Sequence, residues 1–324
     1  MSWFARWSGP ALALHAVSCG SPASDEDTGE SRGPAAAEGS GDSGSTQPGT
    51  SSESPATTGM PSTTTGLSSS STDPSTDESS TGHPDPVETT AFDPATVLFE
   101  EDFEAAATGT TPAGWDSFVG YVVNMNNEPG GSAFALADDS RARSGDQALH
   151  VLGGSTPAML TRPLPATTNR VYVRAYVWLT VGLGQNPGNN HETLLGVRGS
   201  VGQANEEVRF GEIKGVIGTN EVPSDDISPT MKHWGRGPRI EAGQWNCIEV
   251  AFLGDTEPHE VRAWRDGEEV HAVSDPAQWN NGALGTDFLG GKFSEFIVGW
   301  HSFSNLDNEL WVDDLVVATE RIGC

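Results

Sequence analysis

The apolar residues after position 95 follow a pattern that predicts β-strands. In segment 170–180, aliphatic side chains alternate with Tyr172, Arg174, Tyr176 and Trp178. A period of two is typical of a strand with one buried face. Similar short runs, rich in β-branched and aromatic residues and separated by Gly, Pro and Asn, occur at 96–100, 191–197, 207–216, 245–252, 293–300 and 310–317.

Segment 261–270 predicts a β-hairpin that turns at Asp266 and Gly267, because Asp-Gly is a favoured two-residue hairpin turn. No segment keeps a period of 3.6 residues, so we expect few helices. About ten or more short strands without helical crossovers indicate an all-β sandwich or jelly roll.

The first part of the chain has a different composition. Residues 20–90 contain 12 acidic residues against one basic residue, Arg32, and almost no large apolar side chains. Such a segment buries too little surface to offset its ordering entropy. We therefore expect a disordered linker at 20–94 and one folded domain at 95–324.

Residues 1–19 have the pattern of an export signal. Arg6 precedes the short apolar run 11–17, and the sequence Ala16-Val-Ser-Cys19 is similar to a bacterial lipobox, in which Cys19 is lipidated. We expect an exported lipoprotein at the outer membrane or cell surface, attached to the membrane through its lipid anchor alone. The alternative is an ordinary secretory signal with a chance cysteine.

Charge and cysteine content restrict the partners. The formal net charge is −28 and no basic stripe is present, so we expect no nucleic-acid binding. We also expect a monomer. Cysteines in exported domains usually pair, so Cys247 and Cys324 are predicted to form a disulfide.

The polar face of segment 170–180 is the first candidate site. Tyr172, Tyr176 and Trp178 can stack on sugar rings, and Arg174 can pair with a carboxylate. The alternative is a sandwich face covered by loops, with Arg174 paired to a neighbouring acid.

A second group of candidates lies between residues 191 and 234. His191 begins a strand, and Arg209 and Lys214 are expected nearby, an arrangement that suits proton abstraction beside a uronate carboxylate. The alternative for His191 is an ordinary turn histidine. Trp234, in a loop bounded by Pro and Gly, either lines the edge of a cleft or is simple surface.

Calcium is the expected metal, because carboxylates are abundant and no transition-metal motif occurs. Glu101, Asp102 and Glu104 begin the domain, and Asp313 and Asp314 lie near its end. First and last strands of a jelly roll are often neighbours, so these acids can share one ion. The alternative is solvated edge charges.

Five short segments occur in a fixed order, at 99–104, 144–149, 245–249, 261–267 and 311–323. Together they resemble the polysaccharide-lyase-like jelly rolls, a family that includes a fungal cellulose-induced protein core domain and is related in fold to glucuronan and alginate lyases. The resemblance extends over 97–324. It implies a concanavalin-like β-jelly roll with a sugar-facing sheet.

The resemblance also implies a structural Ca²⁺ held by Glu104, Ser144, Gln147 and Asp313, with Asp314 as the alternative ligand. Lyases of this group use His, Arg, Gln or Asn together with a Tyr that often comes from a late strand. Here the tyrosines are Tyr121, Tyr172 and Tyr176, and the late strand carries Trp300 and His301 instead.

We therefore expect a role on acidic polysaccharide. In the enzyme hypothesis, a uronate polymer is cleaved by β-elimination, with Arg174, Tyr176, His191 and Arg209 as the catalytic group. Tyr172, Trp178, Lys214, Trp234 and His301 would bind the substrate. The alternatives are a non-catalytic carbohydrate-binding or adhesion lipoprotein, and a surface protein without a sugar site.

Overall fold

The computed structural model describes residues 92–165, 168–188, 191–199, 207–222, 224–282, 284–290 and 293–324. The predicted signal, Cys19 and nearly all of the predicted linker lie outside the described residues. In the described part of the chain, no helix combines the length and apolarity that a membrane crossing requires.

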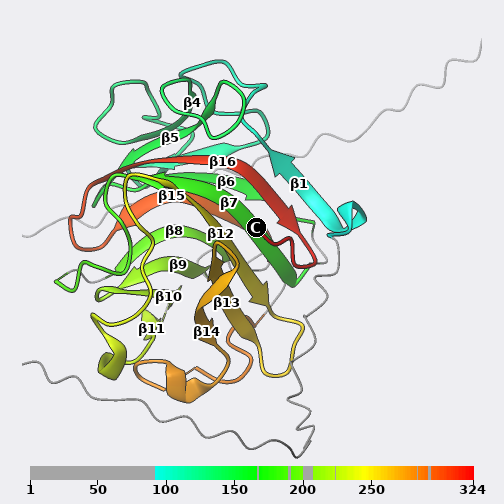
Figure 1. Ribbon diagram of the computed structural model, residues 1–324, viewed down its shortest axis with the longest axis vertical. Helices are drawn as coiled ribbons and strands as arrows, with labels where there is room; N and C mark the ends of the chain where they lie inside the picture. Colours follow the sequence, from blue (N-terminus) through cyan, green and yellow to red (C-terminus); the bar gives the residue numbers. More distant parts are fainter. Residues whose placement is uncertain are drawn as a thin grey trace, which may run out of the picture. The chain divides into compact units, whose positions relative to one another are not determined.

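Two antiparallel sheets of eight strands each form the domain. The first, sheet A, has the strand order β14 (Glu268–Val273), β13 (Glu260–Arg265), β12 (Trp245–Leu253), β7 (Arg170–Leu179), β16 (Asn308–Ala318), β5 (Ala148–Gly153), β4 (Phe134–Asp138). The eighth strand of this sheet, β1 (Val97–Glu101), also pairs with β16. The last strand, red in Figure 1, thus lies beside the first, as expected for a jelly roll.

Sheet B runs in this order: β11 (Asp226–Ser228), β10 (Val216–Val222), β9 (Glu207–Ile213), β8 (His191–Arg198), β15 (Glu295–Ser302), β6 (Ala158–Pro163), β2 (Asp116–Val119), β3 (Val122–Val123). Helical structure among the described residues consists of the 3-10 turns η1 (Pro94–Thr96), η2 (Met231–His233) and η3 (Pro276–Gln278). The predicted all-β sandwich is confirmed.

The core lies between the two sheets. On β7, every second residue from Val171 to Leu179 is buried, so the predicted alternation is confirmed. Phe210, Phe296 and Trp300 of sheet B belong to the same apolar cluster. Burying such side chains is the main stabilising contribution, at about 25 cal/mol per Å² of apolar surface.

Two predicted turns have different outcomes. The hairpin of β13 and β14 turns at Asp266 and Gly267, as predicted. The predicted strand 207–216 is confirmed at 207–213 but its end is wrong, because β9 ends at Ile213 and the chain turns back into β10 through Lys214 and Gly215. Both turn residues have positive φ, at 49° and 80°, which suits a tight hairpin turn.

A β-bulge in β8 shapes the outer face of sheet B. The register with β9 shifts between Thr193 and Leu195, so one extra residue is inserted there. Thr193 therefore faces outward, whereas Leu195 packs in the core, although an unbroken strand would place both on one face. Gly211 lies opposite Thr193, where an added Cβ would lie 2.0 Å from the backbone oxygen of Glu192. The glycine therefore permits the bulge.

The C-terminal tail is attached to β12 in two ways. Cys324 forms the predicted disulfide with Cys247, with their Cα atoms 6.0 Å apart. The fully buried Glu249 accepts hydrogen bonds from the backbone N–H groups of Ile322 (2.7 Å) and Gly323 (3.1 Å). The tail thus closes over the end of sheet A.

Replacing both cysteines with serine should lower the free energy of unfolding by about 2–4 kcal/mol, because the disulfide restricts the unfolded chain over a long loop. Denaturant unfolding of the oxidised protein and of the Cys247→Ser/Cys324→Ser variant measures this difference. Reduced wild-type protein is the control and should match the variant. Equal stability of oxidised and reduced protein would contradict the prediction.

Candidate functional site

The largest of the clefts described here, about 480 Å³, lies on the outer face of sheet B. Its walls combine aromatic, cationic and imidazole side chains, a mixture suited to a charged sugar. The residues with polar or aromatic groups in this cleft are Phe118, Tyr121, His191, Thr193, Arg198, Glu207, Arg209, Asp225, His301 and Phe303.

Tyr121 and His301 meet at one side of the cleft. The Tyr121 hydroxyl lies 3.0 Å from His301 Nε2, although the residues are 180 positions apart in the chain. Tyr121 follows Gly120 at the β2–β3 turn and is 62% exposed. His301, on β15, is only 6% exposed. A tyrosine that is open to solvent therefore contacts an imidazole that is shielded from it.

Phe303 separates the two histidines of the cleft. Its ring centroid lies 4.0 Å from that of His301 and 4.2 Å from that of His191. His191 is 3% exposed, and its Nε2 is 3.8 Å from Asp225 Oδ1. Desolvation by burial lowers the pKa of His191 to about 4. The charge of Arg209 lowers this pKa further, whereas the charge of Asp225 acts in the opposite direction and raises it.

The pKa of His301 is also lowered to about 4, chiefly by burial and then by the charges of Arg209 and His191. Both imidazoles are therefore neutral near pH 7. A neutral imidazole can accept a proton, which is the requirement for a general base.

Arginines supply the positive charge of the cleft. Glu207 accepts from Arg198 Nε at 2.7 Å and also from Arg209 Nε. The Arg209 guanidinium lies 5.3 Å from the Phe303 ring centroid. Arg209 thus stands beside both histidines, where its remaining N–H groups can pair with a carboxylate.

The predicted catalytic group does not meet in one place. Arg174 and Tyr176 are on β7 of sheet A, whereas His191 and Arg209 are on β8 and β9 of sheet B. The four residues therefore do not converge in one cleft, because the apolar layer of the sandwich separates the outer faces of the two sheets.

The aromatic row on β7 is covered rather than open. Arg143 lies 3.4 Å from the Tyr176 ring centroid, and Arg141 lies 3.7 Å from that of Trp178. Tyr172 packs against the cluster that contains Trp264. Arg174 lines a hollow with Glu100, Glu101, Asp102 and Asp314. This face corresponds to the alternative of a covered sandwich surface, and it corrects the prediction of a sugar platform at Tyr172, Tyr176 and Trp178.

The other predicted binding residues lie nearer the cleft. His301 lines it directly. Lys214 is in the β9–β10 turn, beside the Ile213 that pairs with His191. The ring centroid of Trp234 lies 5.8 Å from the Lys214 ammonium nitrogen. Sequence reasoning did not assign Tyr121, because its partner is so distant in the chain that no local motif indicates it.

Of the four residues predicted to bind calcium, Ser144 and Gln147 belong to the loop 143–147, and Glu104 and Asp313 contact it. Glu104 Oε1 accepts from the backbone N–H groups of Asp146 and Gln147, both at 2.9 Å. Asp313, fully buried, accepts from the backbone N–H groups of Arg143 (2.7 Å) and Ser144 (3.1 Å). Ser144 Oγ donates to Asp314 at 2.7 Å.

The donor set here consists of hard oxygen atoms, which fits Ca²⁺. No group of three or more His, Cys, Asp and Glu side chains among the described residues is placed to hold a metal ion. The predicted set has only two carboxylates, together with a hydroxyl and an amide oxygen. Calcium binding by these residues therefore stays a prediction.

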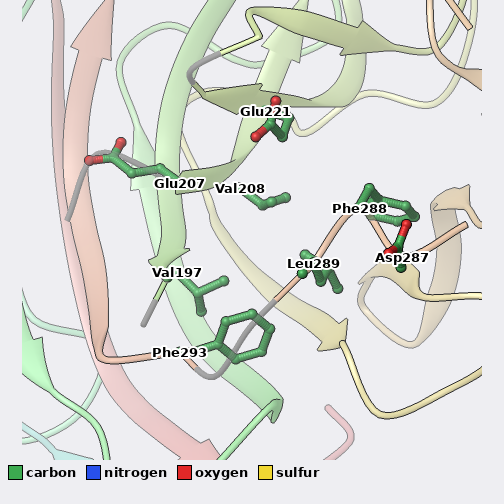
Figure 2. A pocket seen from close by; sticks show the side chains of 10 residues that line it. Val197, Glu207, Val208, Glu221, Asp287, Phe288, Leu289 and Phe293 are labelled. Carbon is green, nitrogen blue, oxygen red and sulfur yellow. The ribbon is translucent and has the colours of Figure 1, made fainter. Parts of the chain in front are cut away.

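A smaller pocket of about 160 Å³ lies on the inner side of sheet B (Figure 2). Val197, Val208, Leu289 and Phe293 line it, and all four belong to the core cluster. Glu207 directs its carboxylate away from this pocket in Figure 2, in keeping with its ion pairs to Arg198 and Arg209. The pocket therefore lies at the margin of the core, and the carboxylate of Glu207 belongs to the cleft instead.

Glu192 supports the cleft from behind. It is 2% exposed and lies opposite Glu212 in the β8–β9 register. Ser302 Oγ donates to it at 3.1 Å and accepts from the backbone N–H of Leu306 at 2.9 Å, which holds the loop containing Phe303. Burial, with repulsion from Glu212, raises the pKa of Glu192 to about 8, so the group is protonated near pH 7.

Glu192 should make the folded state less stable as pH rises. Between its ordinary pKa of 4.5 and about 8, the unfolded chain releases a proton that the folded chain keeps. Glu192→Gln removes this penalty, so its free energy of unfolding should increase relative to wild type between about pH 5 and about pH 8. Denaturant unfolding at both pH values tests this, with the exposed Glu268→Gln as control. A difference that does not change with pH would contradict it.

Comparison with known proteins identifies related folds. The family model described as polysaccharide-lyase-like, Cip1-like core domain matches residues 111–320. The solved structure of "Cellulose induced protein, Cip1" is 22% identical, with 70% of this chain and 99% of that chain covered and a TM-score of 0.49.

An endo-β-1,4-glucuronan lyase from the fungus Trichoderma reesei is 15% identical, with 69% and 96% covered and a TM-score of 0.39. An endo-1,3-β-glucanase from Streptomyces sioyaensis is 11% identical, with 71% and 98% covered and a TM-score of 0.38. No curated protein sequence matches this chain. Because the family model spans most of the chain, the protein belongs to the polysaccharide-lyase-like family with a Cip1-like core domain.

Proposed function

We propose that the protein cleaves an acidic polysaccharide by β-elimination in the cleft on sheet B. The observation that carries the proposal is the contact between the exposed Tyr121 hydroxyl and the buried, neutral His301 beside Arg209. Membership of a polysaccharide-lyase-like family supports a carbohydrate substrate. The arginines of the cleft favour a polymer that contains carboxylates.

The reaction requires three roles. Arg209 pairs with the uronate carboxylate, which makes the proton on C5 more acidic. The Tyr121 oxygen takes that proton as its own proton passes to His301 Nε2. The C5–H electrons form the C4–C5 double bond and the C4–O bond breaks. The leaving oxygen then receives the proton from His301 through Tyr121.

His191 is a positioning residue in this scheme. It is buried against Phe303, and its Nε2 has no hydrogen-bond partner among the described residues. Its neutral ring holds Phe303 against His301 without placing a second positive charge near the imidazole that must accept a proton.

A non-catalytic binding role is the second candidate, and exposed aromatic residues favour it. Tyr121 is 62% and Phe303 is 41% exposed at the cleft. Rings in that position can stack on sugar faces whether or not the sugar is cleaved.

We also propose that the protein is attached to a membrane surface through a lipid on Cys19, with the acidic linker between this anchor and the domain. The domain would then lie outside the cytoplasm. The motif that supports this proposal is Ala16–Cys19.

Tyr121→Phe should reduce the rate of β-elimination by about 10²–10⁴-fold, because general acid–base catalysis contributes that much. Ultraviolet absorbance of unsaturated uronate, followed on a panel of uronate polymers, measures the rate, and His301→Ala should behave similarly. Tyr176→Phe, on the opposite face, is the matched control and should retain activity. Absence of product with every polymer, combined with retention on the same polymers in an affinity gel, would favour the binding role.

We also propose that Glu104, Ser144, Gln147 and Asp313 hold a structural Ca²⁺, which would neutralise the two carboxylates and connect the start of the domain to β16. Chelation should lower the melting midpoint by about 5–10 °C, since a ligand bound only to the folded state stabilises it. The Glu104→Gln variant should show a smaller response to chelator than the control Glu100→Gln. Identical midpoints with and without chelator would reject the assignment.

A further inference from the structure

Cations without an acidic partner are concentrated in one part of the domain. The chain has 17 Lys and Arg against 45 Asp and Glu, so an acidic partner is available for almost every cation. Eight described arginines do form ion pairs. Six described cations form no ion pair: Arg141 and Arg174 on the side of sheet A, and Lys214, Lys232, Arg236 and Arg239, which all lie within segment 214–239.

Two of these cations, Lys232 and Arg236, line a groove separate from the cleft. It measures about 360 Å³ and lies between β10 of sheet B and β14 of sheet A. Lys232, His233 and Arg236 line it, together with the hydrogen-bonding side chains of Thr230 and Gln278. The groove therefore combines unneutralised positive charge with hydroxyl and amide groups.

Exposed apolar side chains occur both at the cleft on sheet B and at the groove between β10 and β14. The large hydrophobic residues that are exposed in the described chain are Tyr121, Val123, Met125, Met231 and Phe303. Tyr121 and Phe303 line the cleft, and Val123 pairs with Phe118, which also lines it. Met231, 65% exposed, stands between Thr230 and Lys232, which both line the groove. An apolar side chain open to water thus lies beside the polar groups of the groove.

A continuous series of contacts connects the cleft to the groove. His191, in the cleft, pairs with Ile213, and Trp234 packs on the cluster that contains Ile213 and Val216. The backbone N–H of Gly235 donates to the Lys214 oxygen at 3.0 Å. The loop with Lys232 and Arg236 is thus held against the β9–β10 turn beside the cleft.

We propose that this groove binds a carboxylate-bearing sugar residue of the same acidic polysaccharide, farther along the polymer from the residue at Tyr121. The inference rests on the proposed substrate class. A domain in such an acidic chain repels a polyanion, so the polymer must be attracted by local positive charge. Lys232 and Arg236 provide charge-assisted hydrogen bonds without first breaking an internal ion pair.

A second subsite has a measurable consequence for polymer length. Binding at two places on one chain strengthens the association of a long polymer, whereas a short oligosaccharide occupies only one place. The affinity of the protein for a long polyuronate should therefore depend on Lys232 and Arg236, whereas its affinity for a uronate trisaccharide should not. Salt should weaken the binding of the long polymer more strongly.

The test compares Lys232→Gln/Arg236→Gln with the control Arg170→Gln/Arg262→Gln, which removes the same charge from the exposed side of sheet A. The dissociation constants of the purified protein for a long polyuronate and for a uronate trisaccharide are measured at low and physiological salt. We expect about tenfold weaker binding of the polymer by the groove variant, with a shallower salt dependence. Trisaccharide binding, and both affinities of the control, should remain within about twofold of wild type.

The outcomes separate this inference from the proposed elimination. Weaker polymer binding by the groove variant supports the groove even if no unsaturated product forms. Unchanged polymer binding by the groove variant, or an equal loss in the control, overturns the groove even if elimination occurs. Failure of the wild-type protein to bind any polyuronate overturns it as well. Melting curves of both double variants confirm that each is folded.

Discussion

The bulge in β8 is the constraint on which the cleft depends. A strand with strict alternation would place His191, Thr193, Leu195 and Val197 on one face. The extra residue places the first two outward and the last two in the core. The register with β15 also shifts at this point, and His301 of β15 lies opposite Thr193. The inserted residue of β8, next to the Thr193–Gly211 pair, thus turns His191 toward the surface that carries His301 without losing core packing.

Electrostatics then distinguishes the two outer faces. On sheet A, the guanidinium groups of Arg141 and Arg143 lie over Trp178 and Tyr176, so the aromatic surface is already occupied. On sheet B, Glu207 binds Arg198 and Arg209 on one side, while burial keeps His191 and His301 neutral. The outer face of sheet A is therefore closed by contacts between its own cations and rings. On the outer face of sheet B, arginines, neutral histidines and the Tyr121 hydroxyl lie together in an open cleft.

Local patterns predicted much of the fold because they depend on near neighbours in the chain. The alternation in β7 and the turn at Asp266 could be predicted for this reason. The Cys247–Cys324 disulfide was predicted from the number of cysteines and from the expectation that the domain is exported. The turn at Lys214 was missed because Lys is not a typical residue for positive φ. The site was predicted only in part: His191, Arg209 and His301 line the cleft, whereas Tyr121 does so through a partner 180 positions away.

The sequence by itself determined the strand content, the difference in composition between the acidic first part of the chain and the rest, and which residue types were available for chemistry. These properties depend on composition and on periods of a few residues. Only the tertiary structure decided that Arg174 and Tyr176 lie on the opposite side of the core from His191, and that Tyr121 meets His301. The physical reason is that alternation assigns each residue to a face of its own strand, whereas strand order and one bulge decide which faces become the same surface.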